Sequence, residues 1–319
     1  MNILVAIDSS AATHAALSAT LARRWSEGTH FRVLTVIPGN LRDKFSDGGI
    51  SSDLFRAHWL IDKASSEIES LNENSIVTGE INVGTPAKSI ISSAEAWPAD
   101  LVVVGSNERG PSEKLLTGSV SKSVMHKANC SVLLARNLVE AHSGCSPMNR
   151  VMLAIDDSPY SNAAVDSVLN STWSENTCFY ILSVMSPLYS GFAYEPSAMV
   201  TNWALEYQEE RHREVEELVL RVSRRFESAF GSAHVECGVI EGFPEVVILK
   251  TARDWGAHLI VVGSHGRPDI AKRFLGSVSQ TVAMNADCSV LIVRSSVAQI
   301  KRIKDRSREP VKLRSASGF

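Results

Sequence analysis

Short apolar runs alternate with longer amphipathic stretches along this chain. Runs of Val, Ile and Leu predict strands, and stretches with apolar residues at helical spacing predict helices. In the second half, the predicted strands are Arg150–Ile155, Cys178–Val184, His234–Ile240, Leu259–Val262 and Ser289–Val293. The predicted helices there are Ser161–Thr172, Trp203–Phe230, Pro244–Trp255 and Gly276–Ala286. This alternation of strand and helix is typical of an α/β protein.

The second half of the chain repeats the first. The matching segments are Asn2–Asp8 with Arg150–Asp156, Leu101–Ser106 with Leu259–Ser264, Leu116–Ser121 with Phe274–Ser279, and Cys130–Arg136 with Cys288–Arg294. Because the matches come in the same order, they indicate duplication of a whole domain. We predict a first domain over residues 1–140, a second over 149–296 and a basic tail over 297–319.

The spacing between matched residues changes once. Trp25 and Trp173 lie 148 residues apart, whereas Gly84 and Gly242 lie 158 residues apart. The second domain therefore contains an insertion of ten residues. We expect it in the Ser186–Thr201 loop, which is rich in Pro, Gly and Tyr.

Apolar strands separated by helices predict, in each domain, a parallel sheet that is covered on both faces. Right-handed crossovers then give a doubly wound sheet, in which ligands bind at the carboxyl ends of the strands, where the strand order reverses. Asp8 and Asp156 follow the first predicted strand of their domains and would lie at this edge. Asp156 is thereby placed to accept a hydrogen bond from a ribose hydroxyl or an adenine amino group.

The composition is that of a globular protein, with 44% hydrophobic and 21% charged residues among 319. No apolar run reaches the roughly 18 residues that a membrane span needs, and no leader-like segment precedes the first strand. Five cysteines without CxxC spacing favour reduced thiols and a cytoplasmic protein. The net charge of −3 gives no support to nucleic-acid binding. Gln299–Phe319 holds seven Lys and Arg against two acids, which indicates a solvated terminus or, alternatively, an adapter for an anionic partner.

The most informative motif lies in the second domain. Gly263 follows a predicted strand, Gly266 comes three positions later, and Gly276-Ser277 opens the last helix. Glycines can adopt positive φ and let a phosphate approach the backbone. The N–H groups at a helix N-terminus favour an anion, and the hydroxyls of Ser277 and Ser279 would add donors. The motif therefore predicts a cradle for a polyphosphate.

These residues, together with the closing strand Cys288–Arg294, resemble the ATP-binding branch of the universal stress protein family over residues 1 to about 296. The resemblance implies tandem Rossmann-like domains, each a five-stranded parallel sheet of order 3-2-1-4-5 with helices on both faces, which pair through their last strands. It also implies an ATP, ADP or AMP site, often with Mg²⁺ on the phosphates. By position, Asp156 would contact the base or ribose and Val184 would line the adenine pocket. The phosphate ligands would be Gly263, Gly266, Gly276, Ser277 and Ser279.

The first domain departs from the motif at one position. Glu108 stands where the second glycine belongs, and Gly110 offers only a shifted turn. A carboxylate about 4 Å from a phosphate would cost roughly 1 to 4 kcal/mol of Coulomb repulsion. We therefore predict a weaker site in this domain, formed by Asp8, Gly105, Gly118 and Ser119.

Other residues allow alternative interpretations. We expect His265 to face solvent in the loop, with a phosphate contact as the alternative. Arg109 and Arg267 would lie on the surface or reach a terminal phosphate. Cys130 and Cys288 are interpreted as buried packing residues rather than redox groups, and the matched tryptophans as core or helix-packing residues.

No catalytic constellation emerges, because the chain contains no P-loop, GxSxG elbow or HExxH helix. The sequence therefore favours a nucleotide-binding protein of stress response or signalling, which binds mainly through its second domain. The alternatives are a scaffold or interaction module without nucleotide and a slow ATPase. We expect the two domains to pair within the chain, with a homodimer as a further option.

Overall fold

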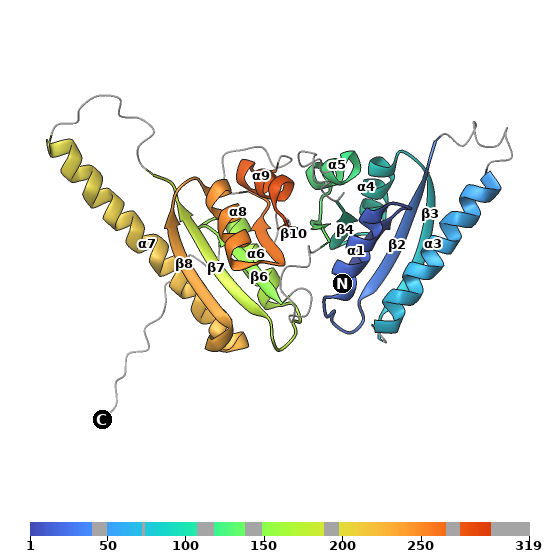
Figure 1. Ribbon diagram of the computed structural model, residues 1–319, viewed down its shortest axis with the longest axis horizontal. Helices are drawn as coiled ribbons and strands as arrows, with labels where there is room; N and C mark the ends of the chain where they lie inside the picture. The colour runs from blue at the N-terminus through green and yellow to red at the C-terminus, as the bar shows by residue number, and fades with distance from the viewer. Residues whose placement is uncertain are drawn as a thin grey trace.

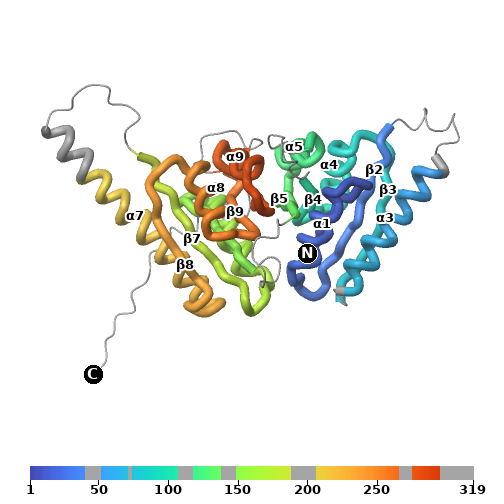
Figure 2. The backbone as a smooth tube through the Cα atoms, in the orientation of Figure 1, coloured from blue at the N-terminus to red at the C-terminus, as the bar shows by residue number. Residues whose placement is uncertain are grey.

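The computed structural model describes residues 1–39, 50–71, 74–106, 118–137, 149–187, 198–265 and 275–294. Two α/β halves lie side by side, with β5 and β10 at the centre and the long helices α3 and α7 at the outer ends (Figure 1). The backbone trace shows the same arrangement, with the first half coloured from blue to green and the second from yellow-green to red (Figure 2). Among the described residues, no helix is both long and apolar enough to cross a bilayer.

In the first half, five strands alternate with four helices among the described residues. The strands are β1 (Asn2–Ile7), β2 (His30–Pro38), β3 (Ile76–Gly84), β4 (Leu101–Gly105) and β5 (Ser131–Ala135). The helices are α1 (Ala11–Leu21), α3 (Ile50–Leu71), α4 (Pro86–Ala96) and α5 (Ser119–Lys127).

The second half has the same order of strands and helices. Its strands are β6 (Arg150–Ile155), β7 (Cys178–Met185), β8 (Val235–Glu241), β9 (Leu259–Gly263) and β10 (Ser289–Val293), and a 3-10 turn, η1 (Ser232–His234), precedes β8. Its helices are α6 (Pro159–Leu169), α7 (Ala198–Phe230), α8 (Pro244–Trp255) and α9 (Ser277–Asn285). All nine elements predicted from the sequence of this half are present, with end shifts of a few residues.

The ten strands of the described residues form one sheet of order β3-β2-β1-β4-β5-β10-β9-β6-β7-β8. Within each half the strands are parallel and follow the predicted order 3-2-1-4-5. The halves join through an antiparallel pair of β5 and β10, in which Leu133 lies opposite Leu291. Because these leucines are 158 residues apart, each faces its own counterpart. A pseudo-two-fold axis therefore passes between them.

The apolar core forms one layer on each face of this sheet. One layer contains buried residues of α1, α3, α6 and α7, such as Ala15, Ile68, Ala164 and Phe226. The other layer contains buried residues of α4, α5, α8 and α9, such as Val124 of α5. Both layers include residues from both halves, so the core continues across the junction.

The ten-residue insertion lies in a helix, so its predicted place in the loop is wrong. The first residues of α3 and α7, Ile50 and Ala198, are still 148 positions apart. Their buried residues Ile68 and Phe226, near the other end, are 158 positions apart. The second half therefore lengthens the helix itself, to 33 residues against 22. Ten residues make nearly three helical turns.

The matched tryptophans serve as packing residues, as predicted. Trp25 meets Phe31 edge to face at 5.8 Å, and Trp173 meets Phe179 in the same way at 5.7 Å. Both indoles donate to a carbonyl of the preceding helix at 2.8 Å. The thiol of Cys288 is buried, and burial raises its pKa to about 12. A thiol with so high a pKa is unreactive near neutrality, which agrees with a packing role.

Two arginines at matched positions connect the halves. Arg136, after β5, donates to the carbonyl of Ala283 at 2.5 Å and to that of Cys288 at 3.1 Å. Arg294, after β10, donates to the carbonyls of Met125 and Ala128. Each guanidinium thus reaches the C-terminal end of the last helix in the opposite half. A cation is favourable there because helix C-termini carry partial negative charge and unpaired carbonyls.

Candidate functional site

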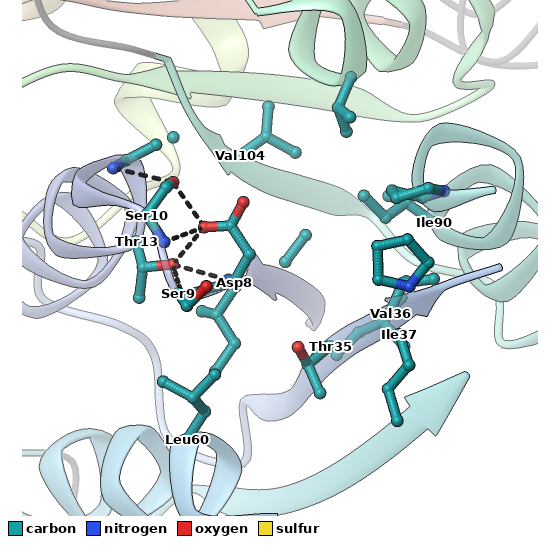
Figure 3. Close-up of a pocket in the computed structure, with 18 of the residues that line it drawn as sticks. Asp8, Ser9, Ser10, Thr13, Thr35, Val36, Ile37, Leu60, Ile90 and Val104 are labelled. Carbon is teal, nitrogen blue, oxygen red and sulfur yellow. Dashed lines mark hydrogen bonds between the residues drawn. The ribbon is translucent and has the colours of Figure 1, made fainter. Parts of the chain in front are cut away.

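A pocket of about 520 Å³ opens in the first half, where the strand order reverses between β1 and β4. Apolar side chains line one part of it, including Val36, Ile37 and Ile90, while Asp8 and Thr13 lie on the opposite side (Figure 3). This position is the predicted one, because parallel strands present their carboxyl ends at a common edge. Volumes of this size are ordinary for small-molecule sites.

The carboxylate of Asp8 is held by the start of α1. Its Oδ1 accepts from the backbone N–H of Ser10 at 2.9 Å, from the Ser10 hydroxyl at 2.6 Å and from the Thr13 hydroxyl at 3.1 Å. Ser10 in turn caps the helix by accepting from the N–H of Ala12. The other carboxylate oxygen points into the pocket (Figure 3). Asp8 is therefore oriented as an acceptor for a ligand.

Asp156 has the same setting in the second half. Its Oδ1 accepts from the N–H of Ser158 at 3.0 Å, and its own N–H donates to the Ser161 hydroxyl at 3.0 Å. Ser158 caps α6 by accepting from the N–H of Ser161, and Pro159 occupies the first turn. In both halves the carboxylate thus lies at the start of the following helix and accepts from the backbone N–H two positions later.

Gly105 and Gly263 have a packing role that the sequence does not predict. Neither has positive φ. A Cβ on Gly105 would lie 1.8 Å from the carbonyl oxygen of Ala12, and one on Gly263 would lie 2.7 Å from the carbonyl carbon of Tyr160. These glycines are therefore required because the first turn of α1 or α6 crosses the strand end. Both remain at the carboxyl edge, and Gly105 lines the pocket.

Gly118 and Gly276 cap the last helix of each half in extended conformation, without a side-chain cap. The first-turn N–H groups that follow are those a phosphate would use. The hydroxyl of Ser279, however, donates to the carbonyl of Gly263 at 2.6 Å, and the residue is 6% exposed. One of the two predicted hydroxyl donors, that of Ser279, is therefore already engaged in a hydrogen bond that joins α9 to β9.

The structure brings the motif together most clearly in the first half. Six residues that line its pocket occupy the positions of the predicted ligands: Asp8, Val36, Gly105, Gly118, Ser119 and Ser121. In the second half, Asp156, Val184, Gly263, Gly276, Ser277 and Ser279 occupy the matching positions of β6, β7, β9 and α9. Gly266 and Glu108, on which the predicted difference between the halves depends, lie outside the described residues, as do Arg109, Gly110 and Arg267.

His265 does not face solvent freely, contrary to our expectation. Its ring centroid lies 4.9 Å from that of Tyr160, and its Nδ1 is 3.1 Å from the Ser264 hydroxyl. Its Nε2 is buried without a hydrogen-bond partner among the described residues. Burial first, and then the charge of Arg294, lower the pKa of this imidazole. His265 is therefore a neutral, partly buried residue at the edge of the second site.

Sequence reasoning missed the contribution of α3. Asp53, Arg56, Ala57 and Leu60 of this helix line the pocket of the first half. No motif marks them, because they come from an ordinary amphipathic helix whose position depends on the fold. At the 158-residue spacing of the helix core, Glu214 of α7 corresponds to Arg56. An arginine in the helix of the first half is thus matched by a glutamate in that of the second.

Comparisons with known proteins identify the family of this chain. The family model described as "Universal stress protein family" matches residues 1–136 and 148–294. The chain belongs to the universal stress protein family. A universal stress protein of Mycolicibacterium smegmatis is 30% identical over 219 residues, which are 68% of this chain and 69% of that protein. One of Mycobacterium tuberculosis is 26% identical over 239 residues, 73% and 74% of the two chains.

A solved structure gives the same fold. The crystal structure of a universal stress protein from Archaeoglobus fulgidus aligns with a TM-score of 0.60, covering 93% of this chain and 97% of that chain. At 21% sequence identity the likeness shows the fold alone. Two universal stress protein domains in one chain thus account for the duplicated pattern and for the single ten-stranded sheet.

Proposed function

We propose that this universal stress protein binds an adenine nucleotide (ATP, ADP or AMP) at the carboxyl edge of its sheet and acts in stress response or signalling. The observation that carries the proposal is the pocket of the first domain, where six motif positions from four separate segments meet around about 520 Å³. Such a convergence favours a ligand site over tight turns and helix starts that occur independently.

The two sides of the pocket suit the two parts of a nucleotide. The side chains of Val36, Ile37 and Ile90 offer an apolar surface for a base, and the free oxygen of Asp8 can accept from a ribose or an amino group. The N-terminus of α5, opened by Gly118, offers backbone N–H groups to phosphates. The corresponding groups of the second domain are Asp156, Val184 and the N-terminus of α9.

We further propose that the second domain binds the phosphates more tightly. This asymmetry rests on the sequence, in which Gly266 completes the motif and Glu108 interrupts it. Among the described residues, no three His, Cys, Asp or Glu side chains are grouped to hold a metal ion. A Mg²⁺ ion would therefore be held chiefly by the nucleotide's phosphates.

The experiment is a titration of the full chain with ATP by isothermal calorimetry. We expect close to one tight site per chain, which Gly266→Glu abolishes and which Glu108→Gly raises toward two. The two substitutions are matched controls for each other, since one removes and the other restores the same motif position. Two equal sites in the unaltered chain would contradict the asymmetry, and no heat at all with ATP, ADP or AMP would favour a scaffold without nucleotide.

A further inference from the structure

One buried cation lies between the two domains. Arg23, just after α1, is 7% exposed, and its guanidinium carbon lies 4.8 Å from the ring centroid of Trp25 and 5.1 Å from that of Trp173. Its Nη2 donates to the hydroxyl of Ser171 at 2.7 Å. The guanidinium of the first domain is therefore held between the matched indoles of both domains. Cation–π contacts of this kind become stronger when the cation is removed from water.

The partner of Arg23 is its own counterpart. Ser171 lies 148 residues after Arg23, which is the spacing of matched positions in this part of the chain. A residue can contact its counterpart only where the pseudo-two-fold axis passes, as Leu133 and Leu291 do in the sheet. The space between the two indoles therefore lies on the axis, and it is shared by both domains.

The pseudo-two-fold axis relates each point of one domain to a point of the other, but a space on the axis is related to itself. Such a space therefore has room for one guanidinium, which either domain can supply. The chain supplies one arginine and one serine, which fit together. Two first domains would bring two guanidiniums into this space, where burial already lowers the pKa of Arg23 to about 10. Two second domains would supply two serines and leave the space between the indoles without its cation. Both like pairs are therefore less favourable than the mixed pair.

We propose that Arg23 is a specificity determinant of domain pairing, which makes the first domain select the second domain rather than another copy of itself. The partner that fits this surface has a small hydroxyl residue opposite Arg23 and a tryptophan two positions later, as Ser171 and Trp173 provide. This inference concerns the faces of α1 and α6 near the axis and does not rest on nucleotide binding.

Three variants of the full chain reproduce the three occupancies of the space. Arg23→Ser leaves it without an arginine, as in a pair of second domains. Ser171→Arg supplies two arginines, as in a pair of first domains. The double variant Arg23→Ser/Ser171→Arg supplies one arginine again, from the opposite domain. Arg24→Ser is the control, because this neighbouring arginine is exposed.

The measurement is the thermal unfolding midpoint of each variant under identical conditions. We expect each single variant to unfold about 5 °C or more below the unaltered chain. We expect the double variant to regain most of that loss, and Arg24→Ser to change little. A double variant that is no more stable than the weaker single variant would overturn the proposal, since it would make Arg23 an ordinary packing residue. The comparison rests on the double variant, which contains both substitutions. It therefore remains informative even if one of the single variants folds poorly.

Discussion

Two glycines determine how closely the first helix of each domain lies on the sheet. The Cβ of any other residue at Gly105 or Gly263 would collide with backbone, which cannot move aside as a flexible side chain can. The sequence suggests positive φ and a close phosphate approach for Gly263; its φ is not positive, and the close contact of each glycine with the first helix of its domain was not predicted. The repeated motif marks these positions in the sequence. The backbone atoms that exclude a Cβ belong to α1 and α6, which are distant along the chain and are brought there only by the fold.

At these glycines we expect substitution by alanine to destabilise the fold in proportion to the overlap. Gly105→Ala should cost at least the upper end of the roughly 1–3 kcal/mol typical of overpacking, because its Cβ would lie 1.8 Å from the Ala12 oxygen. Gly263→Ala, with a closest approach of 2.7 Å, should cost less. Urea denaturation of both variants measures the difference. Equal stability of Gly105→Ala and the unaltered chain would contradict this packing.

At the scale of elements, apolar patterning predicted the strands and helices well, and α8 (Pro244–Trp255) has the predicted bounds. The sequence favours a loop for the ten inserted residues because Pro, Gly and Tyr nearby are typical of loops, whereas the structure has them as extra turns of α7. When the two halves are aligned, the ten-residue insertion can be placed at several points along an amphipathic helix with little change to the helical period of apolar residues. The apolar pattern alone therefore does not fix where the insertion lies. The contacts of Arg136 and Arg294 were missed because they cross between domains.

These two arginines should contribute to stability through the helices that they cap. Arg136→Met and Arg294→Met each keep an apolar stem but remove charged hydrogen bonds to two backbone carbonyls of the opposite domain, at least one of them in the last turn of α9 or α5. Each variant should lose about 2 kcal/mol or more of unfolding free energy, because hydrogen bonds to charged groups are the stronger class and the carbonyls are left unpaired. Chemical denaturation of the full chain tests this.

The control is Arg225→Met, on the surface of the second domain. Arg225 pairs with Asp166 at 2.6 Å, but both side chains are more than a third exposed. Such pairs contribute about 1 kcal/mol or less. If Arg225→Met cost as much as the two interdomain variants, the stabilisation could not be attributed to capping across the junction.

At the scale of the whole molecule, duplication and strand order were predictable, but the relation between the two domains was only partly so. Pairing through the last strands followed from the family resemblance. The position of Arg23 between the two indoles was not predicted, although the sequence contains a signal. Leu21 and Trp25 recur as Leu169 and Trp173, whereas Ser171 stands at the position that matches Arg23. A difference inside a well-matched segment indicates a position where the copies are not equivalent. Pseudo-symmetric contacts of this kind depend on the assembled fold.

Because both core layers and the sheet continue through the junction, we expect the two domains to unfold together. Separating them would expose the β5–β10 pair, the indoles around Arg23 and two helix ends at once. Differential scanning calorimetry of the unaltered chain should therefore show one transition, with equal calorimetric and van't Hoff enthalpies.

Gly263→Ala, which weakens the second domain alone, provides the stringent test of this coupling. It should shift the whole transition and lower hydrogen-exchange protection in β1 as well as in β6. A separate early transition confined to the second domain would show instead that the junction is too weak to couple them, and that the continuous sheet joins two independently stable domains.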